Sequence, residues 1–238
     1  MIRSTIRWSI EQVRSRLLAG VAHQEDLDRL YDQIAGLMQI QSAMGGTPIL
    51  KPMRGWALSP DAMGWILTDL QERSSPTVVE FGCGQSTVIL AAWIKNRGAG
   101  RLTSFEHDPA YAAAIRRQLE ACGLASQVDL QVVPLVEYPA VGALPPCQSY
   151  ALPDRRDLAI DVALVDGPPY WAGDATRYHP LRWAADRLSP DGAVYLDDTI
   201  RAAEQGVVRE LCLQVPAIVT ENLKAEKGLT RGKRGSAG

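Results

Sequence analysis

The sequence predicts an α/β protein built on a doubly wound, mostly parallel sheet. From residue 77 onward, segments that favour strands alternate with segments that favour helices, which is the pattern of βαβ units. In the first unit, Gly82-Cys83-Gly84 directly follows a run of strand-forming residues, and Ser86-Thr87 open the helix after it. Glycine suits such a turn because it adopts positive φ and lets a ligand approach the bare backbone.

The segment before residue 77 is expected to be helical in two parts. In residues 1–44, apolar residues recur at steps of three and four, with a second series after Gly20. We expect this N-terminal extension, residues 1–45, to pack on the domain, to pair with a second copy in a homo-oligomer, or to cap a substrate cleft. A further helix is expected from Ser59-Pro60, since serine suits the N-cap and proline the first helical position.

The remaining elements follow in order within a domain of residues 46–223. A strand is expected from Thr77, with further strands over 102–106, 128–133, 162–165, 193–196 and 217–220, and helices over 110–121, 181–188 and 203–213. The proline-rich stretch 134–157 is long for a connection, so a functional or mobile loop is expected. Residues 228–234 contain few strand formers, and residues 224–238 are expected to be a basic, flexible tail.

The composition limits the classes of partner and compartment that are expected for this chain. A chain of 238 residues with 46% hydrophobic content can bury a large core, and a formal net charge of −2 argues against a nucleic-acid partner. No apolar run approaches the ~20 residues of a membrane span. Cys83, Cys122, Cys147 and Cys212 are widely spaced, which favours free thiols in a reducing compartment over a disulfide framework or a zinc site. A cytoplasmic protein is therefore expected.

Polar residues stand where the predicted parallel strands end. Ligands of open α/β sheets bind beyond the carboxyl ends of the strands, so these residues mark the expected site. Glu106, after the second strand, is placed to accept hydrogen bonds from both hydroxyls of a ribose. The third glycine of the dinucleotide-binding fingerprint is replaced by Thr87, which argues against a pyrophosphate-containing cofactor. S-adenosylmethionine has a ribose and no phosphate, and fits this pattern.

Two motifs carry a family resemblance. Val79-Glu80-Phe81-Gly82-Cys83-Gly84 with Ser86-Thr87, followed by Ser104-Phe105-Glu106-His107-Asp108, resembles the first two motifs of class I S-adenosylmethionine-dependent methyltransferases. The resemblance implies a Rossmann-like sheet of seven strands with the last one antiparallel. It places Gly82, Cys83 and Gly84 at the methionine part of the cofactor, Glu106 at the ribose and His107 near the adenine. The cofactor-binding residues expected in this way are Glu80, Gly82, Cys83, Gly84, Ser86, Thr87, Glu106, His107 and Asp166.

A narrower resemblance concerns three carboxylates. Asp166 with Asp197-Asp198 looks like the metal-binding triad of the cation-dependent catechol and natural-product sugar O-methyltransferases. Carboxylates that converge at one sheet edge repel one another unless a cation compensates, and oxygen ligands suit Mg²⁺ or Mn²⁺. These three residues are therefore the expected metal ligands. The alternative gives Asp197 and Asp198 structural or solvated roles and Asp166 contact with the cofactor alone.

Further residues are expected to face the cleft between the fourth strand and the helix after the fifth. Tyr170, Arg177, Tyr178 and Arg201 are the expected substrate-binding residues, the arginines as partners of an anionic group or of neighbouring acids. His179 is a candidate general base, because its unperturbed pKa is ~6.5. Asp166, Asp198 and His179 are thus the expected catalytic residues.

The function expected from this set is an S-adenosylmethionine-dependent O-methyltransferase. Its acceptor would be a saccharide or another hydroxylated small molecule, and a divalent cation would assist the reaction. Two alternatives stay open. One is a metal-free N- or O-methyltransferase with His179 or Asp198 as base, and the other is a non-catalytic binding protein that retains the cofactor fold.

Overall fold

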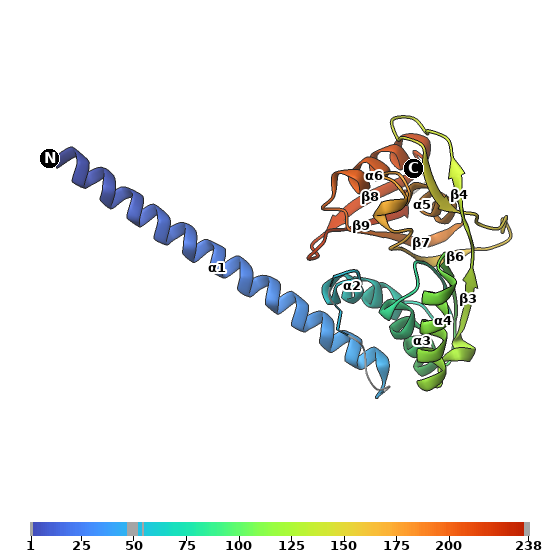
Figure 1. Ribbon diagram of the computed structural model, residues 1–238. Coiled ribbons are helices and arrows are strands. Elements are labelled where there is room, and N and C mark those ends of the chain that lie inside the picture. Colours follow the sequence, from blue (N-terminus) through green and yellow to red (C-terminus); the bar gives the residue numbers. More distant parts are fainter. Residues whose placement is uncertain (1, 47–51, 54, 236–238) are drawn as a thin grey trace.

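The computed structural model describes residues 2–46, 52–53 and 55–235. A seven-stranded sheet has helices on both faces, and a separate two-stranded hairpin lies beside it (Figure 1). The helices are α1 (Ile2–Met44), α2 (Pro60–Gln71), α3 (Gln85–Arg97), α4 (Pro109–Ala121), α5 (Tyr178–Ala185) and α6 (Ala202–Gln214), with short 3₁₀ turns at Ala125–Gln127 and Tyr170–Ala172. The strands are β1 (Thr77–Phe81), β2 (Arg101–Glu106), β3 (Val128–Val132), β4 (Leu135–Tyr138), β5 (Cys147–Tyr150), β6 (Ile160–Val165), β7 (Leu188–Asp197), β8 (Ile218–Leu223) and β9 (Leu229–Arg234).

The large sheet has the strand order β3-β2-β1-β6-β7-β9-β8. Strands β3, β2, β1, β6 and β7 are parallel to their neighbours. Strand β9 is antiparallel to both β7 and β8. The doubly wound sheet with a reversed last strand that the resemblance implies is confirmed.

Strand β9 corrects the expectation for the C-terminal segment. Residues 229–234 were expected in a flexible tail, yet they form an inner strand of the sheet. Gly232 fits the place closely, because a Cβ there would lie 3.2 Å from both Ile218 Cγ2 and Val194 Cγ1. Hydrogen bonds to strands on both sides therefore override a low intrinsic strand propensity.

The hairpin of β4 and β5 corrects a second expectation. The proline-rich stretch 134–157 was expected to be a loop, but Leu135–Tyr138 pairs antiparallel with Cys147–Tyr150. Pro139, Pro145 and Pro146 lie between the two strands, where no ladder hydrogen bond is needed from them. The strands can therefore pair although the stretch as a whole is rich in proline.

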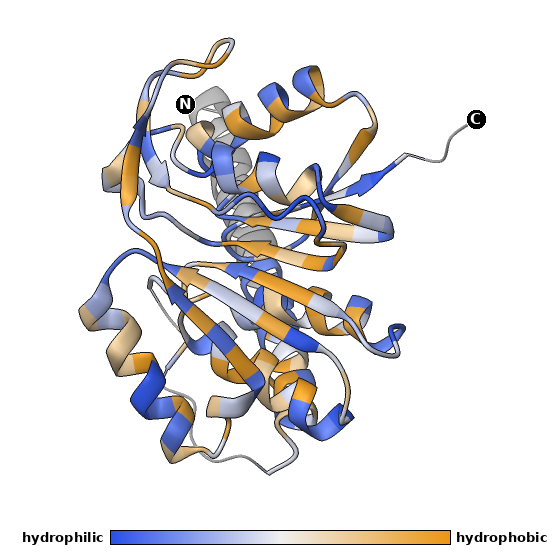
Figure 2. Cartoon of the chain, turned by 90° about the vertical axis from the view of Figure 1, so that its right-hand side faces the viewer, coloured by the Kyte–Doolittle hydropathy of each residue, from blue (hydrophilic) through white to orange (hydrophobic). Residues whose placement is uncertain are grey.

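Successive residues of the central strands face opposite layers of the core. Val78 and Val162 belong to a cluster with residues of α1 to α4, whereas Val79 and Ala163 belong to a cluster with residues of α5 and α6. Figure 2 shows the inner strands as mostly hydrophobic, while the helices carry hydrophilic residues on their outer sides. Burial on both faces explains why these strands read as continuous apolar runs.

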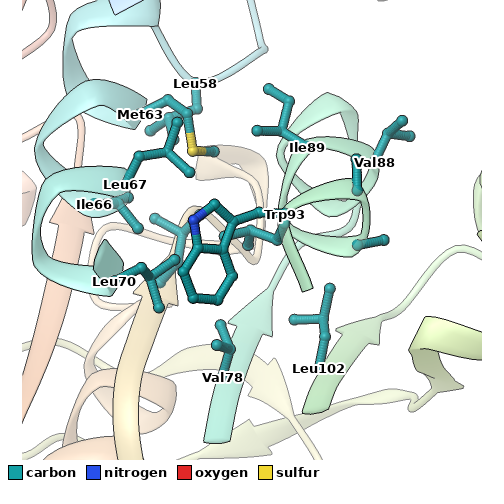
Figure 3. Packing of buried hydrophobic residues seen from close by; sticks show 14 of the residues in the cluster. Leu58, Met63, Ile66, Leu67, Leu70, Val78, Val88, Ile89, Trp93 and Leu102 are labelled. Atoms are coloured by element: carbon teal, nitrogen blue, oxygen red, sulfur yellow. The ribbon is translucent and has the colours of Figure 1, made fainter. Parts of the chain in front are cut away.

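Helix α3 lies in the middle of the first cluster. Its Trp93 side chain packs among Leu67 and Leu70 of α2 and Val78 of β1 (Figure 3). Residues Val88 to Ile94 of α3 are all buried. The helix that follows the glycine turn is thus fixed on several sides, which holds the turn in place at the sheet edge.

Helix α1 continues through Gly20 as a single element of 43 residues. Its C-terminal part contacts the domain, with Ile40 and Met44 in the core and Asp32 Oδ2 2.8 Å from Lys224 Nζ, and its N-terminal part projects away (Figure 1). The side chains of Leu30 and Met38 on this helix are exposed. Within the described residues, no helix combines the length and the apolar character that a membrane crossing requires.

Candidate active site

A cavity of about 610 Å³ opens at the carboxyl ends of β1, β2, β6 and β7. Open α/β sheets bind their ligands at this edge. The glycine turn forms part of its wall, with Gly82 at φ 93° and its backbone N–H donating to the Phe105 carbonyl at 2.8 Å. A Cβ at Gly82 would lie 3.2 Å from the Asp166 backbone. Glycine therefore lets the ends of the neighbouring strands β1 and β6 approach closely at the cavity.

Glu80 lies beneath this turn and does not line the cavity. Its Oε2 accepts hydrogen bonds from Thr87 Oγ1 at 2.5 Å and from Ser104 Oγ at 2.7 Å. Thr87 Oγ1 in turn accepts one from the Gly84 backbone N–H at 2.8 Å. Complete burial raises the pKa of Glu80 to about 7. The Glu80 side chain therefore stabilises the glycine turn through its hydrogen bond with Thr87.

Glu106 stands at the end of β2 with its carboxylate fixed by backbone amides. Its oxygens accept hydrogen bonds from the N–H groups of Cys83 at 3.2 Å, His107 at 2.8 Å and Asp108 at 2.9 Å. The residue is buried, but it forms part of the cavity wall. A carboxylate held in one orientation at this place can accept hydrogen bonds from a ligand's hydroxyl groups.

Asp166, Asp197 and Asp198 converge at the ends of β6 and β7. One carboxylate oxygen of each residue lies within 4.8 Å of those of the other two. Burial, reinforced by the charge of Asp197, raises the pKa of Asp166 well above its usual range, and burial also raises the pKa of Asp197. Asp198 has a φ of 63°, a left-handed conformation that few non-glycine residues adopt and that is common at functional sites.

Arg177 lies between two of these carboxylates. Its Nη2 is 3.0 Å from Asp198 Oδ2 and 3.3 Å from Asp166 Oδ1. The same guanidinium donates to the backbone carbonyls of Asp197 and Asp166, at 3.1 and 3.2 Å. The side chain is buried, and although burial opposes it, the charges of Asp166 and Asp198 raise the pKa of Arg177. Arg177 is therefore a fixed internal cation.

Lys227 and Arg201 bring two more positive charges to the same carboxylates. Lys227 Nζ is 2.9 Å from Asp197 Oδ2 and 3.5 Å from Asp198 Oδ1, and it belongs to the turn before β9. Arg201 Nη1 is 3.0 Å from Asp198 Oδ2. Both residues, like Arg177, form part of the cavity wall.

These cations decide whether a divalent metal ion fits the triad. The oxygen donors alone would suit Mg²⁺. However, Arg177 and Lys227 already lie within hydrogen-bond distance of the carboxylate oxygens, and the backbone carbonyls around Arg177 keep it in place. The residues present therefore do not fit a divalent cation. From the sequence, Arg177 and Arg201 were expected as partners of an anionic group or of neighbouring acids, and the structure pairs both with acids, whereas Lys227 was not expected there.

Part of the remaining expected site lies elsewhere. His179 stacks on Tyr138 of the hairpin, with ring centroids 3.7 Å apart, and is not among the residues that line the cavity. Burial lowers its pKa to about 4. Tyr178, the first residue of α5, has its side chain buried in the core. These positions correct the expectation that His179 is a catalytic base and Tyr178 a substrate contact, because both side chains pack against protein.

The expected cofactor-binding residues divide in the same way. Those that line the cavity are Gly82, Cys83, Glu106, His107 and Asp166, whereas Glu80, Gly84, Ser86 and Thr87 do not. Ser86 and Thr87 are buried at the start of α3. Of the expected substrate-binding residues, Tyr170, Arg177 and Arg201 line the cavity.

Trp56 and Lys227 form part of the cavity wall but are not among the site residues expected from the sequence. Trp56 stacks on Tyr170 with ring centroids 5.5 Å apart, although both rings are exposed at 69% and 59%. Trp171 lies next to His107, with centroids 5.4 Å apart. Trp56 precedes the first strand and Lys227 follows the sixth predicted one, so no strand-end rule points to either. In the structure, the exposed stack of Trp56 on Tyr170 is the feature that identifies Trp56 as a site residue.

The comparisons with known proteins agree with this geometry. The family model described as a methyltransferase domain matches residues 79–199. A catechol O-methyltransferase of Niastella koreensis is 28% identical over 160 residues, which span 64% of this chain and 67% of that protein.

Solved structures with the same fold include methyltransferases with bound cofactor. The Podospora anserina methyltransferase PaMTH1, bound to S-adenosylhomocysteine, matches with a TM-score of 0.60 at 16% identity, over 90% of this chain and 96% of that one. An O-methyltransferase from Bacillus cereus matches with a TM-score of 0.55 at 16% identity, over 84% and 90%. Because the family model covers half of the chain, the protein belongs to the methyltransferase family, as a class I S-adenosylmethionine-dependent enzyme.

Proposed function

We propose that this chain transfers the methyl group of S-adenosylmethionine to a hydroxyl of a saccharide or another hydroxylated small molecule. One observation carries the proposal: a single cavity joins the fixed Glu106 carboxylate to the Asp198 carboxylate, with an exposed aromatic wall at its mouth. The catechol O-methyltransferase relative and the O-methyltransferases among the structural neighbours support oxygen as the methyl acceptor.

The cofactor would lie across the ends of β1 and β2. Glu106 would accept hydrogen bonds from the two ribose hydroxyls, and His107 would face the adenine. Gly82 and Cys83 would line the methionine part, and Asp166 would lie near it. This pose is supported by the positions of these residues in the cavity wall. It directs the sulfonium toward the carboxylates after β6 and β7.

The reaction needs alignment and a proton acceptor. The acceptor oxygen forms a bond to the methyl carbon as the carbon–sulfur bond breaks, and the sulfonium becomes a neutral thioether. The hydroxyl proton would pass to Asp198, which forms part of the cavity wall. Its Oδ2 is paired with Arg177 and Arg201, and its Oδ1 lies 3.5 Å from Lys227 Nζ. Holding donor and acceptor in line would supply most of the rate enhancement. The reaction would proceed without a divalent cation, because Arg177 and Lys227 are paired with the carboxylates that would hold one.

The acceptor would bind against the aromatic wall. Trp56 and Tyr170 present flat apolar surfaces that suit the face of a sugar or an aromatic ring. Arg201 is 43% exposed, so it remains accessible to polar groups of the acceptor, whereas Arg177 is committed to buried partners. A hydroxylated ring fits both features.

Calorimetry with S-adenosylhomocysteine tests the cofactor half of this proposal. The wild-type chain is expected to bind the ligand, and Glu106→Ala is expected to weaken binding by about tenfold to hundredfold, because hydrogen bonds to a charged group are lost. The matched control is Glu120→Ala, which removes an exposed carboxylate of α4 and should leave binding unchanged. Equal heats for wild type and Glu106→Ala would contradict the pose.

A panel of sugars, catechols and amines tests the acceptor. Release of S-adenosylhomocysteine is expected with hydroxylated acceptors. Methyl transfer to amines alone would contradict the oxygen assignment, and binding without turnover on any class would favour a non-catalytic cofactor-binding protein.

A further inference from the structure

The acid cluster beyond β6 and β7 contains its own counter-charges. Within the described residues, the carboxylates of Asp166, Asp197, Asp198 and Glu204 face the cationic side chains of Arg177, Arg201 and Lys227. A buried carboxylate without a cationic or hydrogen-bonding partner is strongly destabilising. The chain thus compensates most of this negative charge with side chains from three separate segments.

Arg177 cannot leave this cluster easily. Besides its ion pairs, its guanidinium donates to the carbonyl oxygens of Pro168 at 3.4 Å, Asp197 at 3.1 Å and Asp166 at 3.2 Å. A metal ion that displaced it would leave these three buried carbonyls without their donor. The guanidinium bridges Asp166 and Asp198, two of the three residues expected to hold a metal ion.

Lys227 stands on the side of the cluster that faces the cavity. Its Nζ contacts both Asp197 and Asp198, and its side chain is 21% exposed. The Lys227 ammonium thus lies against carboxylates of two residues, Asp197 Oδ2 and Asp198 Oδ1. It can therefore contact a ligand in the cavity while it remains paired with the two aspartates.

We infer that Arg177 and Lys227 take the place of the divalent cation expected among Asp166, Asp197 and Asp198, and that the chain excludes such an ion. If the proposed function is right, a consequence follows for the reaction. The Lys227 ammonium is then the cation next to the acceptor oxygen, and it donates a hydrogen bond to that oxygen while the proton passes to Asp198.

Manganese binding tests the inference without any methyl acceptor. Mn²⁺ is titrated into the full chain in the presence of S-adenosylhomocysteine, and electron paramagnetic resonance measures the free ion. Wild type is expected to show no saturable Mn²⁺ site. Lys227→Met removes the ammonium from Asp197 Oδ2 and Asp198 Oδ1 and leaves a net negative site. A saturable Mn²⁺ site is therefore expected to appear, with an affinity at least about tenfold above the upper limit that wild type sets.

Two further variants make the result specific. Lys224→Met removes an exposed lysine whose Nζ pairs with Asp32 at 2.8 Å, and it should behave like wild type. Lys227→Gln keeps a polar side chain in case Lys227→Met does not fold, with retained S-adenosylhomocysteine binding as the check on folding. A saturable site in wild type that Asp197→Asn abolishes would overturn the inference. So would folded Lys227 variants that still exclude Mn²⁺.

Discussion

The two halves of the cavity are stabilised by different forces, although they lie at the same sheet edge. Around β1 and β2, Glu80 and Glu106 accept hydrogen bonds from hydroxyl groups and backbone amides. Around β6, β7 and β9, Asp166, Asp197 and Asp198 are paired with arginine and lysine side chains. The first half, called the cofactor half after the pose proposed above, has mainly neutral donors. The second half, called the acceptor half in the same way, depends on charge compensation.

The difference predicts unequal tolerance to substitution. A lost neutral donor costs about 1 kcal/mol in a typical case, because the remaining group keeps other partners or water. A lost partner of a buried ion leaves an uncompensated charge, which costs about 3–5 kcal/mol. The acceptor half is therefore expected to be more sensitive in stability, and the cofactor half more sensitive in ligand affinity.

The largest effect is expected from Arg177→Met in the acceptor half. The substitution leaves Asp166 and Asp198 buried without their shared guanidinium, so the free energy of unfolding should fall by about 3–5 kcal/mol. Urea unfolding followed by circular dichroism measures it. Arg182→Met is the control, because its pair with Asp186 is 37% and 41% exposed and should contribute at most about 1 kcal/mol. Similar losses of unfolding free energy in Arg177→Met and Arg182→Met would contradict the special sensitivity of the acceptor half.

A pH-dependent effect is expected from Glu80 in the cofactor half. Its folded-state pKa of about 7 exceeds the ordinary glutamate pKa of 4.5, so between these pH values the native state retains a proton that the unfolded chain has released. Wild-type stability should therefore fall as pH rises from 4.5 to 7, by about 3 kcal/mol relative to Glu80→Gln, and the difference should level off above pH 7. Urea unfolding of both proteins across this range measures it. If the free energies of unfolding of the two proteins changed in parallel with pH, Glu80 would already be ionised in the folded state.

The smallest effect is expected from Asp108→Ala, also in the cofactor half. Asp108 Oδ1 caps α4 by accepting hydrogen bonds from the backbone N–H groups of Ala110 at 2.8 Å and Tyr111 at 3.2 Å. Its removal should lower the free energy of unfolding by about 1 kcal/mol. Asp108→Asn, which preserves a capping oxygen, should recover most of that loss. A loss as large as that of Arg177→Met would show that the cofactor half is not the more tolerant one.

The sequence predicts the cofactor half well, because its geometry follows from neighbouring segments. Glu106 ends a strand that directly follows the glycine turn and its helix, and parallel pairing of β1 with β2 brings both to the same edge. The same strand-end rule brings Asp166 together with Asp197 and Asp198. Each of these positions depends only on where a strand stops, which the alternation of elements in the sequence already indicates.

The sequence predicts the acceptor half only in part, because Lys227 and the surroundings of His179 depend on segments without a local signal. Lys227 reaches Asp197 only because β9 inserts next to β7, and residues 229–234 have low strand propensity. His179 was a reasonable base by chemistry, but the hairpin places Tyr138 against its ring. Tertiary packing decides both positions, and no spacing rule in the chain encodes it.

The position of β9 has a consequence for synthesis on the ribosome. Strands β7 and β8 leave the exit tunnel before β9, yet β9 separates them in the finished sheet. Until residues 229–234 emerge, the β7 edge that β9 will occupy has no strand partner, and β8 cannot join the sheet. A nascent chain that stalls there exposes edges of the kind at which aggregation starts, and it also lacks Lys227 beside the aspartates.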